Sequence, residues 1–399
     1  GACAKAKGGC TGQTDKAVNK RQKGKEHERE AKKLRLKAQK LAAGNDTAVS
    51  DEELLKIDQE IEEAFEKMKE AKKAMLKAQG FAEGEVEPLD DGSWGGDTML
   101  TVEQAQRVID YQNQADEDED IVAPPPPSGR AKRYATFMEE NSGALWTEFP
   151  IPYVFDTETP FSDDQKEKVR TAVRDIEGKT CIRFQEMASV PAGSHLFFMR
   201  TDYAPHCGLS YIGRVQQNSI KLNFAECDYK IIGTAIHEMM HALGVHHEMI
   251  RYDRDTFLTM NYDNMDPRMT DMFEPGDNTV TTGYGTEFDY YSIMMYTAWV
   301  ASVDEDIPSF EPVMEPKDVL TEVMGQRETM SPKDASLLRK MYCDKECDDM
   351  EVWCGWWATD GICKSNRDVF LDYCPKSCGF CPVAATDMAR EIVATGIIP

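Results

Sequence analysis

The sequence predicts an α+β protein in which a helical N-terminal segment precedes a mixed domain and a small cysteine-rich module follows it. Short β-rich runs at 151–155, 181–184 and 195–199, with a helical pattern at 163–176, have the order of strands, helices and loops expected of an α+β domain. Six cysteines lie within residues 347–381, a stretch too short to build an adequate apolar core. Disulfides must therefore hold this module, which places the chain in an oxidising compartment.

The N-terminal segment has the pattern of helices. One helix is expected at about residues 25–42, and Ser50 with Glu53 forms a capping box that opens a second. In the second helix, apolar residues recur every seven positions: Leu54, Ile61, Met68 and Met75. This pattern fits a short coiled coil or helical hairpin, or else an amphipathic helix that merely packs on its own protein, and we favour the last.

Bulk charge excludes one class of function. The net charge is −25 and the isoelectric point is about 4.7, which argues against a nucleic-acid-binding protein because such a protein needs a basic face.

No apolar run approaches the roughly 18 residues needed to cross a bilayer, so we expect no membrane span. The chain starts without a signal peptide although its cysteines indicate secretion, and we interpret this as prior removal of the signal.

The segment before the mixed domain has the composition of an exposed linker. An acidic run at 116–120 is followed by four prolines at 124–127 and by Arg130-Ala-Lys-Arg133. Arg-x-Lys-Arg in such a linker is typical of a proprotein convertase site. We therefore expect residues 1–133 to be a propeptide and cleavage after Arg133 to start the mature chain at Tyr134.

A histidine cluster predicts a zinc site. His237 and His241 are four residues apart, so a helix places both imidazoles on one face within reach of one Zn²⁺. Glu238 is displaced round the helix, where it can accept a proton from a metal-bound water. Gly244 allows the backbone to leave the helix, and His247 returns as the third ligand. Three neutral ligands leave one position for water, which indicates a catalytic site.

These residues carry a resemblance to a known family. The pattern HExxHxxGxxH with a downstream methionine turn is the metzincin signature. Within that class the chain resembles the astacin family, because Glu248 follows the third histidine and the run 251–255 continues the family's HExxRxDRD. The segment 292–296 matches the family's SxMHY methionine turn, with Met295 in place of the usual histidine.

The resemblance implies a metzincin zinc-protease domain over residues 134–344, with a twisted mixed β-sheet and a long active-site helix. It implies a zinc endopeptidase with one Zn²⁺ per subunit, in which Glu238 is the general base. Tyr296 would stabilise the oxyanion, and Met294 would form an apolar floor beneath the metal. After cleavage, Glu248 would receive the new amino terminus through water.

The resemblance extends to the N-terminal segment. Trp94-Gly-Gly-Asp97 resembles the FxGD segment of astacin propeptides, in which the aspartate occupies the position of the catalytic water on zinc. This implies a zymogen that Asp97 inhibits and that cleavage after Arg133 activates. An ordinary glycine-rich turn is the alternative interpretation of these four residues.

The cysteines agree with the same resemblance. Residues 347–381 resemble a ShKT module, which is similar to sea-anemone toxins and is often appended to such proteases, and 382–399 are expected to be a tail. The family pairings would be Cys181–Cys343, Cys207–Cys227, Cys347–Cys381, Cys354–Cys374 and Cys363–Cys378. Toxin members block potassium channels with a Lys-Tyr pair, but Asp368 and Val369 occupy the aligned positions, so docking to a partner is favoured.

The expected partners are protein or peptide substrates, an activating proprotein convertase and a docking partner of the ShKT module. The expected location is extracellular, and the domain order is similar to that of proteases from cnidarian stinging capsules (nematocysts). The main alternative is a binding or toxin protein in which an inactive protease scaffold presents the ShKT module. A structural protein held by disulfides would explain the cysteines but not the zinc motif.

Overall fold

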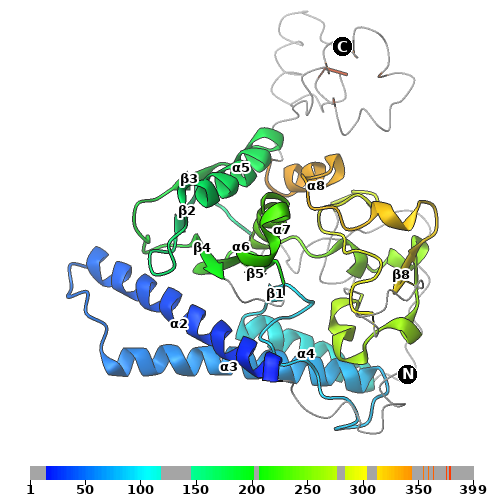
Figure 1. The fold of residues 1–399 in the computed structure, drawn as a ribbon, viewed down its shortest axis with the longest axis horizontal. Helices are drawn as coiled ribbons and strands as arrows, with labels where there is room; N and C mark the ends of the chain where they lie inside the picture. The colour runs from blue at the N-terminus through cyan, green and yellow to red at the C-terminus, as the bar shows by residue number, and fades with distance from the viewer. Residues whose placement is uncertain are drawn as a thin grey trace, which may run out of the picture.

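The computed structural model describes residues 15–117, 145–201, 206–275, 284–302 and 312–343, together with 354, 358, 363, 374, 377 and 378. A mixed sheet lies at the centre, with helices on both of its faces (Figure 1). Helices α5 (Asp163–Lys179), α7 (Ile231–Ala242) and α8 (Pro332–Tyr342) lie on one side of the sheet (Figure 1). The N-terminal helices α2 (Asp15–Ala42), α3 (Asp51–Ala78) and α4 (Val102–Glu117) lie on the other side (Figure 1). This arrangement confirms the α+β prediction.

The sheet has six strands in the order β1-β5-β6-β4-β2-β3. Its parallel core consists of β2 (Ile151–Phe155), β3 (Phe184–Glu186), β4 (His195–Thr201) and β6 (Gln217–Asn223). Strand β5 (Gly208–Tyr211) runs antiparallel to β6. The two-residue strand β1 (Thr98–Met99), from the N-terminal segment, pairs with β5 in parallel and forms one edge of the sheet. The sequence therefore folds an N-terminal piece directly onto the sheet.

The inner face of the sheet carries the main apolar core. Helices α5 (Asp163–Lys179), α7 (Ile231–Ala242) and α8 (Pro332–Tyr342) pack there. Capping boxes start α5 at Ser162 and α8 at Ser331, because each serine satisfies a backbone N–H that the first helical turn leaves unpaired. Alternate residues of the strands, such as Leu196 and Phe198, point toward this core.

Short elements complete the half of the domain that follows α7. A second apolar cluster there is built around β7 (Leu258–Met260) and β8 (Met314–Pro316), which pair in antiparallel fashion. The short helices of this half are η2 (Glu248–Ile250), η3 (Arg254–Thr256), η4 (Tyr262–Asn264), η5 (Pro267–Met272) and η6 (Thr321–Val323), whereas α6 (Phe224–Cys227) and η1 (Asp228–Lys230) precede α7.

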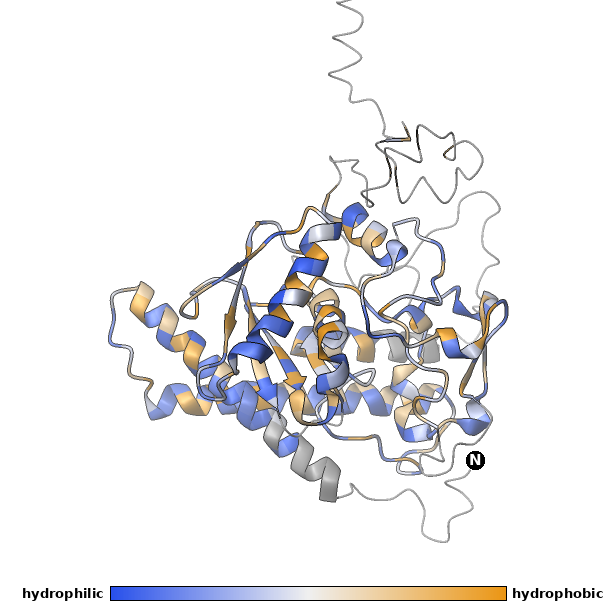
Figure 2. Ribbon diagram, turned by 45° about the horizontal axis from the view of Figure 1, so that its top comes forward, coloured by the Kyte–Doolittle hydropathy of each residue, from blue (hydrophilic) through white to orange (hydrophobic). Residues whose placement is uncertain are grey.

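The N-terminal segment forms a helical hairpin, α2 (Asp15–Ala42) and α3 (Asp51–Ala78), followed by α4 (Val102–Glu117). Both capping-box hydrogen bonds between Ser50 and Glu53 are present at the start of α3. Hydrophilic and hydrophobic residues share each helix (Figure 2), and the apolar side of α3 is buried. The pattern therefore belongs to a helical hairpin, the interpretation that we did not favour, and this hairpin also packs on its own protein, as the favoured interpretation expected.

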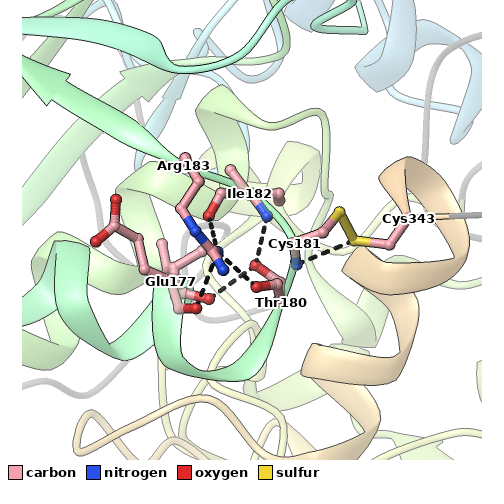
Figure 3. Close-up of a disulfide and its surroundings, with 7 residues drawn as sticks. Glu177, Thr180, Cys181, Ile182, Arg183 and Cys343 are labelled. Carbon is pink, nitrogen blue, oxygen red and sulfur yellow. Dashed lines mark hydrogen bonds between the residues drawn. A yellow bond between two sulfur atoms is a disulfide. The ribbon is translucent and has the colours of Figure 1, made fainter. Parts of the chain in front are cut away.

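One predicted strand is displaced. The prediction placed a strand at 181–184, whereas β3 begins at Phe184. The hydroxyl of Thr180 donates to the carbonyl of Ile176 at 2.7 Å and accepts from the N–H of Ile182 at 3.2 Å, so these residues form the exit from α5 (Figure 3). Cys181, in the same turn, is bonded to Cys343 at the end of α8 (Figure 3).

The structure contains four of the expected disulfides: Cys181–Cys343, Cys207–Cys227, Cys354–Cys374 and Cys363–Cys378. Cys347 and Cys381 lie outside the described residues, as do Cys3 and Cys10. Within the part of the chain that the structure describes, none of the helices combines the length and the apolar character that crossing a bilayer requires.

Candidate active site

Helix α7 supplies two of the three clustered imidazoles. His237 and His241 are fully buried on one face of this helix, one turn apart. Gly244 adopts a φ of 94°, a conformation that disfavours any residue with a side chain, and thereby turns the chain back toward the helix. This turn brings His247 to the pair. The three Nε2 atoms lie 3.1 to 3.3 Å from one another.

Backbone carbonyls fix the orientation of the imidazoles on α7. Nδ1 of His237 lies 2.7 Å from the carbonyl oxygen of Ile293, and Nδ1 of His241 lies 2.7 Å from that of Val245. A carbonyl only accepts, so each Nδ1 carries the proton and each Nε2 presents a lone pair to the cluster. Burial also lowers the pKa of His237 to about 3 and that of His247 to about 4, which keeps both rings neutral.

Asp97 from the N-terminal segment completes the cluster. Its Oδ1 lies 2.8 Å from Nε2 of His247, and its Oδ2 lies 3.1 Å from Nε2 of His237. One ligand atom from each of the four side chains lies within 4.8 Å of all the others. Converging lone pairs of neutral imidazoles and a buried carboxylate repel one another unless a cation lies between them. This donor set, three imidazole nitrogens and one carboxylate oxygen, fits the tetrahedral preference of Zn²⁺.

Glu238 lies beside the cluster with its carboxylate buried. The carboxylate packs against Gly208 of β5, where a Cβ would lie 2.2 Å from Oε1 of Glu238, so only glycine leaves room for the carboxylate in this position. Burial and the neighbouring carboxylate of Asp97 hold the pKa of Glu238 well above its usual range. The carboxyl group therefore lies next to the metal position, and its role as general base stays a prediction.

The methionine turn contacts the cluster through the carbonyl of Ile293, which accepts from Nδ1 of His237. Asp334 of α8 holds this turn by accepting from the hydroxyl of Ser292 at 2.6 Å and from the N–H of Ile293 at 2.8 Å. Met294 is buried and its carbonyl accepts from the N–H of Glu248 at 3.0 Å. Met295, the departure from the family pattern, is fully buried in the second apolar cluster. A thioether suits that environment better than an imidazole, which would need a hydrogen-bond partner.

Tyr296 faces the cluster from the same turn. The centroid of its ring lies 4.3 Å from that of His247, and its hydroxyl donates to the carbonyl of Gly95 at 2.9 Å. Burial raises the pKa of Tyr296 well above its usual range, so the phenol keeps its proton. The guanidinium of Arg327 lies 6.0 Å from the centre of the Tyr296 ring and donates to the carbonyl of Met295 at 2.9 Å.

The backbone around Asp97 is held by residues that the sequence analysis missed. The N–H of Gly95 donates to Oδ2 of Asp271 at 2.9 Å, and that oxygen lies 3.4 Å from Nζ of Lys72 on α3. Gly96 has a φ of 100°, and a Cβ there would lie 2.7 Å from the hydroxyl of Tyr296. The sequence pattern could have indicated a role for Lys72, because this lysine interrupts the otherwise apolar face of α3.

Glu248 lies immediately after the third histidine but outside the cluster. Its Oε1 accepts from the N–H of Asp289 at 2.8 Å and from the guanidinium of Arg251 at 3.0 Å. Burial raises the pKa of Glu248 to about 8. Arg133 and Tyr134 lie outside the described residues, so the pairing of Glu248 with a new amino terminus stays a prediction.

Together, a histidine pair on one helix turn, a third histidine after a glycine, an intervening carboxyl group and a methionine turn define a metzincin-type site. The model of the astacin peptidase family matches residues 138–343, and that of ShK domain-like modules matches 346–381. The chain therefore belongs to the astacin family, as the resemblance predicted.

Relatives in two species agree. Zinc metalloproteinase nas-11 of Caenorhabditis elegans is 38% identical over 92% of this chain and 66% of its own length. Zinc metalloproteinase nas-10 of the same species is 38% identical over 75% of this chain and 55% of its own length. Protein SpAN of Strongylocentrotus purpuratus is 30% identical over 66% of this chain and 40% of its own length. The chain thus spans between two fifths and two thirds of these relatives.

Among solved structures, high choriolytic enzyme 1, a hatching enzyme zinc-protease from Oryzias latipes, is 28% identical to this chain. The match covers 52% of this chain and 98% of that one, with a TM-score of 0.45. The similarity to cnidarian nematocyst proteases stays a prediction.

Proposed function

We propose that this chain is a secreted zinc endopeptidase made as a zymogen, in which residues 1–133 are the propeptide, Asp97 blocks the metal and cleavage after Arg133 begins activation. The observation that carries the proposal is the convergence of His237, His241 and His247 on the carboxylate of Asp97. Asp97 lies 140 residues before His237 in the sequence, and the fold brings its carboxylate to the three histidines.

Three imidazoles would hold the zinc ion, which when bound acidifies a water molecule and polarises the scissile carbonyl. Glu238 is the chain's own base: once Asp97 has left, its carboxylate takes a proton from the attacking water and passes it to the leaving amine. Tyr296 supplies a phenol that donates a hydrogen bond to the substrate's carbonyl oxygen as negative charge develops there. Both groups are buried, where such interactions are stronger than in water.

The N-terminal segment occupies both features that a peptide substrate needs. Asp97 lies where the water belongs, and β1 pairs with β5, the strand that would form the edge of the sheet without the N-terminal segment and to which an extended peptide could then add as a strand. The hydroxyl of Tyr296 is also engaged by the carbonyl of Gly95. Departure of residues 94–99 therefore frees the metal position, the strand edge and the phenol together, which supports the zymogen proposal.

The disulfides support secretion, since such bonds persist in oxidising compartments. We further propose that the module at 347–381 docks the enzyme to a partner, with proteins or peptides as substrates of the catalytic domain. The alternative of a binding or toxin protein on an inactive scaffold gains no support from the site, which keeps all three histidines and Glu238.

The test compares the purified chain before and after cleavage at Arg133, with bound zinc measured by elemental analysis and activity measured on a peptide library. We expect one zinc ion per chain and activity only after the propeptide has been removed. Glu238→Gln should keep the zinc and lose at least about a hundredfold in kcat, the scale of a lost general base. Full activity of this variant would disprove the proposed chemistry.

A further inference from the structure

We propose that the outer face of the sheet is a docking surface for the α2–α3 hairpin that outlasts cleavage, so that the cut propeptide remains bound as a non-covalent inhibitor. The inference rests on the proposed zymogen function. The hairpin, rather than the bond after Arg133, then controls when the propeptide leaves the active site.

The first part of the docking surface is apolar. Val154 of β2 and Phe197 and Met199 of β4 point away from the main core and form a separate buried cluster with Ala31 of α2. Leu34, one turn further along α2, packs against the same cluster. Without the hairpin these three side chains of the sheet would form an exposed apolar patch, and such patches on soluble proteins mark binding sites.

A buried ion pair lies next to this cluster. Nζ of Lys221, on β6, lies 3.1 Å from Oε1 of Glu28 on α2, and the two side chains are only 4% and 3% exposed. The hydroxyl of Tyr211, on β5, donates to Oε2 of Glu28 at 3.3 Å. Removing one member of a buried pair leaves the other charge desolvated and uncompensated, so this pair ties the hairpin to one place on the sheet.

The other helix of the hairpin is anchored independently. Lys72 of α3 lies 3.4 Å from Oδ2 of Asp271, the residue that holds Gly95. Ile212, which follows β5, is buried in an apolar cluster together with Phe65 and Met68 of α3. Both helices therefore contact the catalytic domain through apolar and charged groups, and α3 reaches the inhibitory segment itself.

Cleavage leaves these contacts in place. They join residues 28–99 to residues 154–271, and the bond after Arg133 lies between the two ranges in the sequence and belongs to neither. Cutting that bond removes the covalent link, which lowers the effective concentration of the hairpin, but it removes none of the contacts. Release then depends on the affinity of the hairpin for the sheet.

Part of the interface is polar. A cavity of about 350 Å³ lies between the hairpin and the sheet, and Glu28, Arg35, Tyr211 and Ser219 are among the residues that line it. Dissolved ions screen charges that line an open cavity more than they screen fully buried charges. We therefore expect release of the cut propeptide to be faster at high ionic strength than at low ionic strength.

The experiment uses the full chain with residues 130–133 replaced by the recognition sequence of a site-specific protease, so that the cut does not depend on a convertase. After complete cutting, gel filtration at low and high salt reports whether the two fragments travel together. We expect co-elution at low salt, peptidase activity below about a tenth of that of the separated catalytic fragment, and separation at high salt. Immediate separation at low salt with full activity would overturn the inference.

Charge reversal tests the ion pair. Lys221→Glu should weaken retention of the cut propeptide at least about tenfold, and the exchange Glu28→Lys with Lys221→Glu should restore it. Arg174→Glu is the matched control, because Arg174 lies on α5, on the opposite face of the sheet, with 56% of its side chain exposed. Equal retention of the Lys221→Glu and Arg174→Glu fragments would contradict the inference, and so would failure of the exchange to restore binding in a folded chain.

The readout separates this inference from the proposed function. Co-elution requires no catalytic activity, so a retained hairpin on a catalytic fragment that stays inactive after separation disproves the peptidase and leaves the docking surface standing. A fragment that is active as soon as the bond is cut and has already lost the hairpin disproves the docking surface alone.

Discussion

Lys72 provides a sharp test of how the hairpin controls the active site. Lys72→Met removes the ammonium group and keeps most of the apolar stem. The ammonium group donates to the carbonyl of Leu89 at 3.0 Å, and it lies 3.4 Å from Asp271 and 3.8 Å from Asp91, with Lys72 only 5% exposed. The substitution therefore leaves two buried carboxylates without their cation.

Breaking a buried ion pair from one side costs about 3–5 kcal/mol. If half of that cost falls on the docked position of residues 94–97, the equilibrium between blocked and open site shifts by roughly tenfold or more, because 1.4 kcal/mol corresponds to a factor of ten. We expect the uncut Lys72→Met zymogen to cleave a fluorogenic peptide at least about tenfold faster than the uncut wild type.

Lys73→Met is the matched control, since Lys73 is the next residue of α3, is half exposed and pairs with Glu87 at 3.3 Å on the surface. Exposed pairs contribute at most about 1 kcal/mol, so this variant should keep the basal activity of the wild type. A Lys72→Met zymogen that melts at a lower temperature and yet shows wild-type basal activity would refute the reasoning, because Lys72 would then stabilise the fold without holding the inhibitory segment.

The remaining predictions concern the metal, the switch and pH. Asp97→Ala should make the uncut chain active, and a variant no more active than the wild type would show that Asp97 is not the switch. Tyr296→Phe should lower kcat by about 10²–10³, the cost of one lost oxyanion donor, with little change in KM in steady-state assays. Chelation of the metal should abolish activity and lower the melting temperature, and added Zn²⁺ should restore both. Burial and the nearby ammonium of Lys221 lower the pKa of His27 on α2 to about 4, whereas an unfolded histidine titrates near 6.5. The unfolded chain therefore binds the proton first, so the zymogen should lose stability as the pH falls from 6.5 toward 4, and His27→Gln should flatten this dependence in thermal melts.

Much of the site was predictable because its geometry is local. A spacing of four residues on a helix determines that His237 and His241 share a face, and the conformational freedom of glycine explains the return of the chain to His247. The capping boxes at the starts of helices are local in the same sense, since each involves four consecutive residues. The start of β3 was predicted three residues too early, because the hydrogen bonds of Thr180 prolong the exit from α5.

By itself, the sequence determined the class of site, its three imidazoles and the family to which the domain belongs, and it predicted the base. Only the tertiary structure decided how the N-terminal segment is held: Glu28 meets Lys221, and Lys72 meets Asp271, each across more than a hundred residues of chain. The physical reason is that no local rule links such distant residues. Their pairing exists only once the hairpin and the sheet have folded against each other and excluded water from the charges between them.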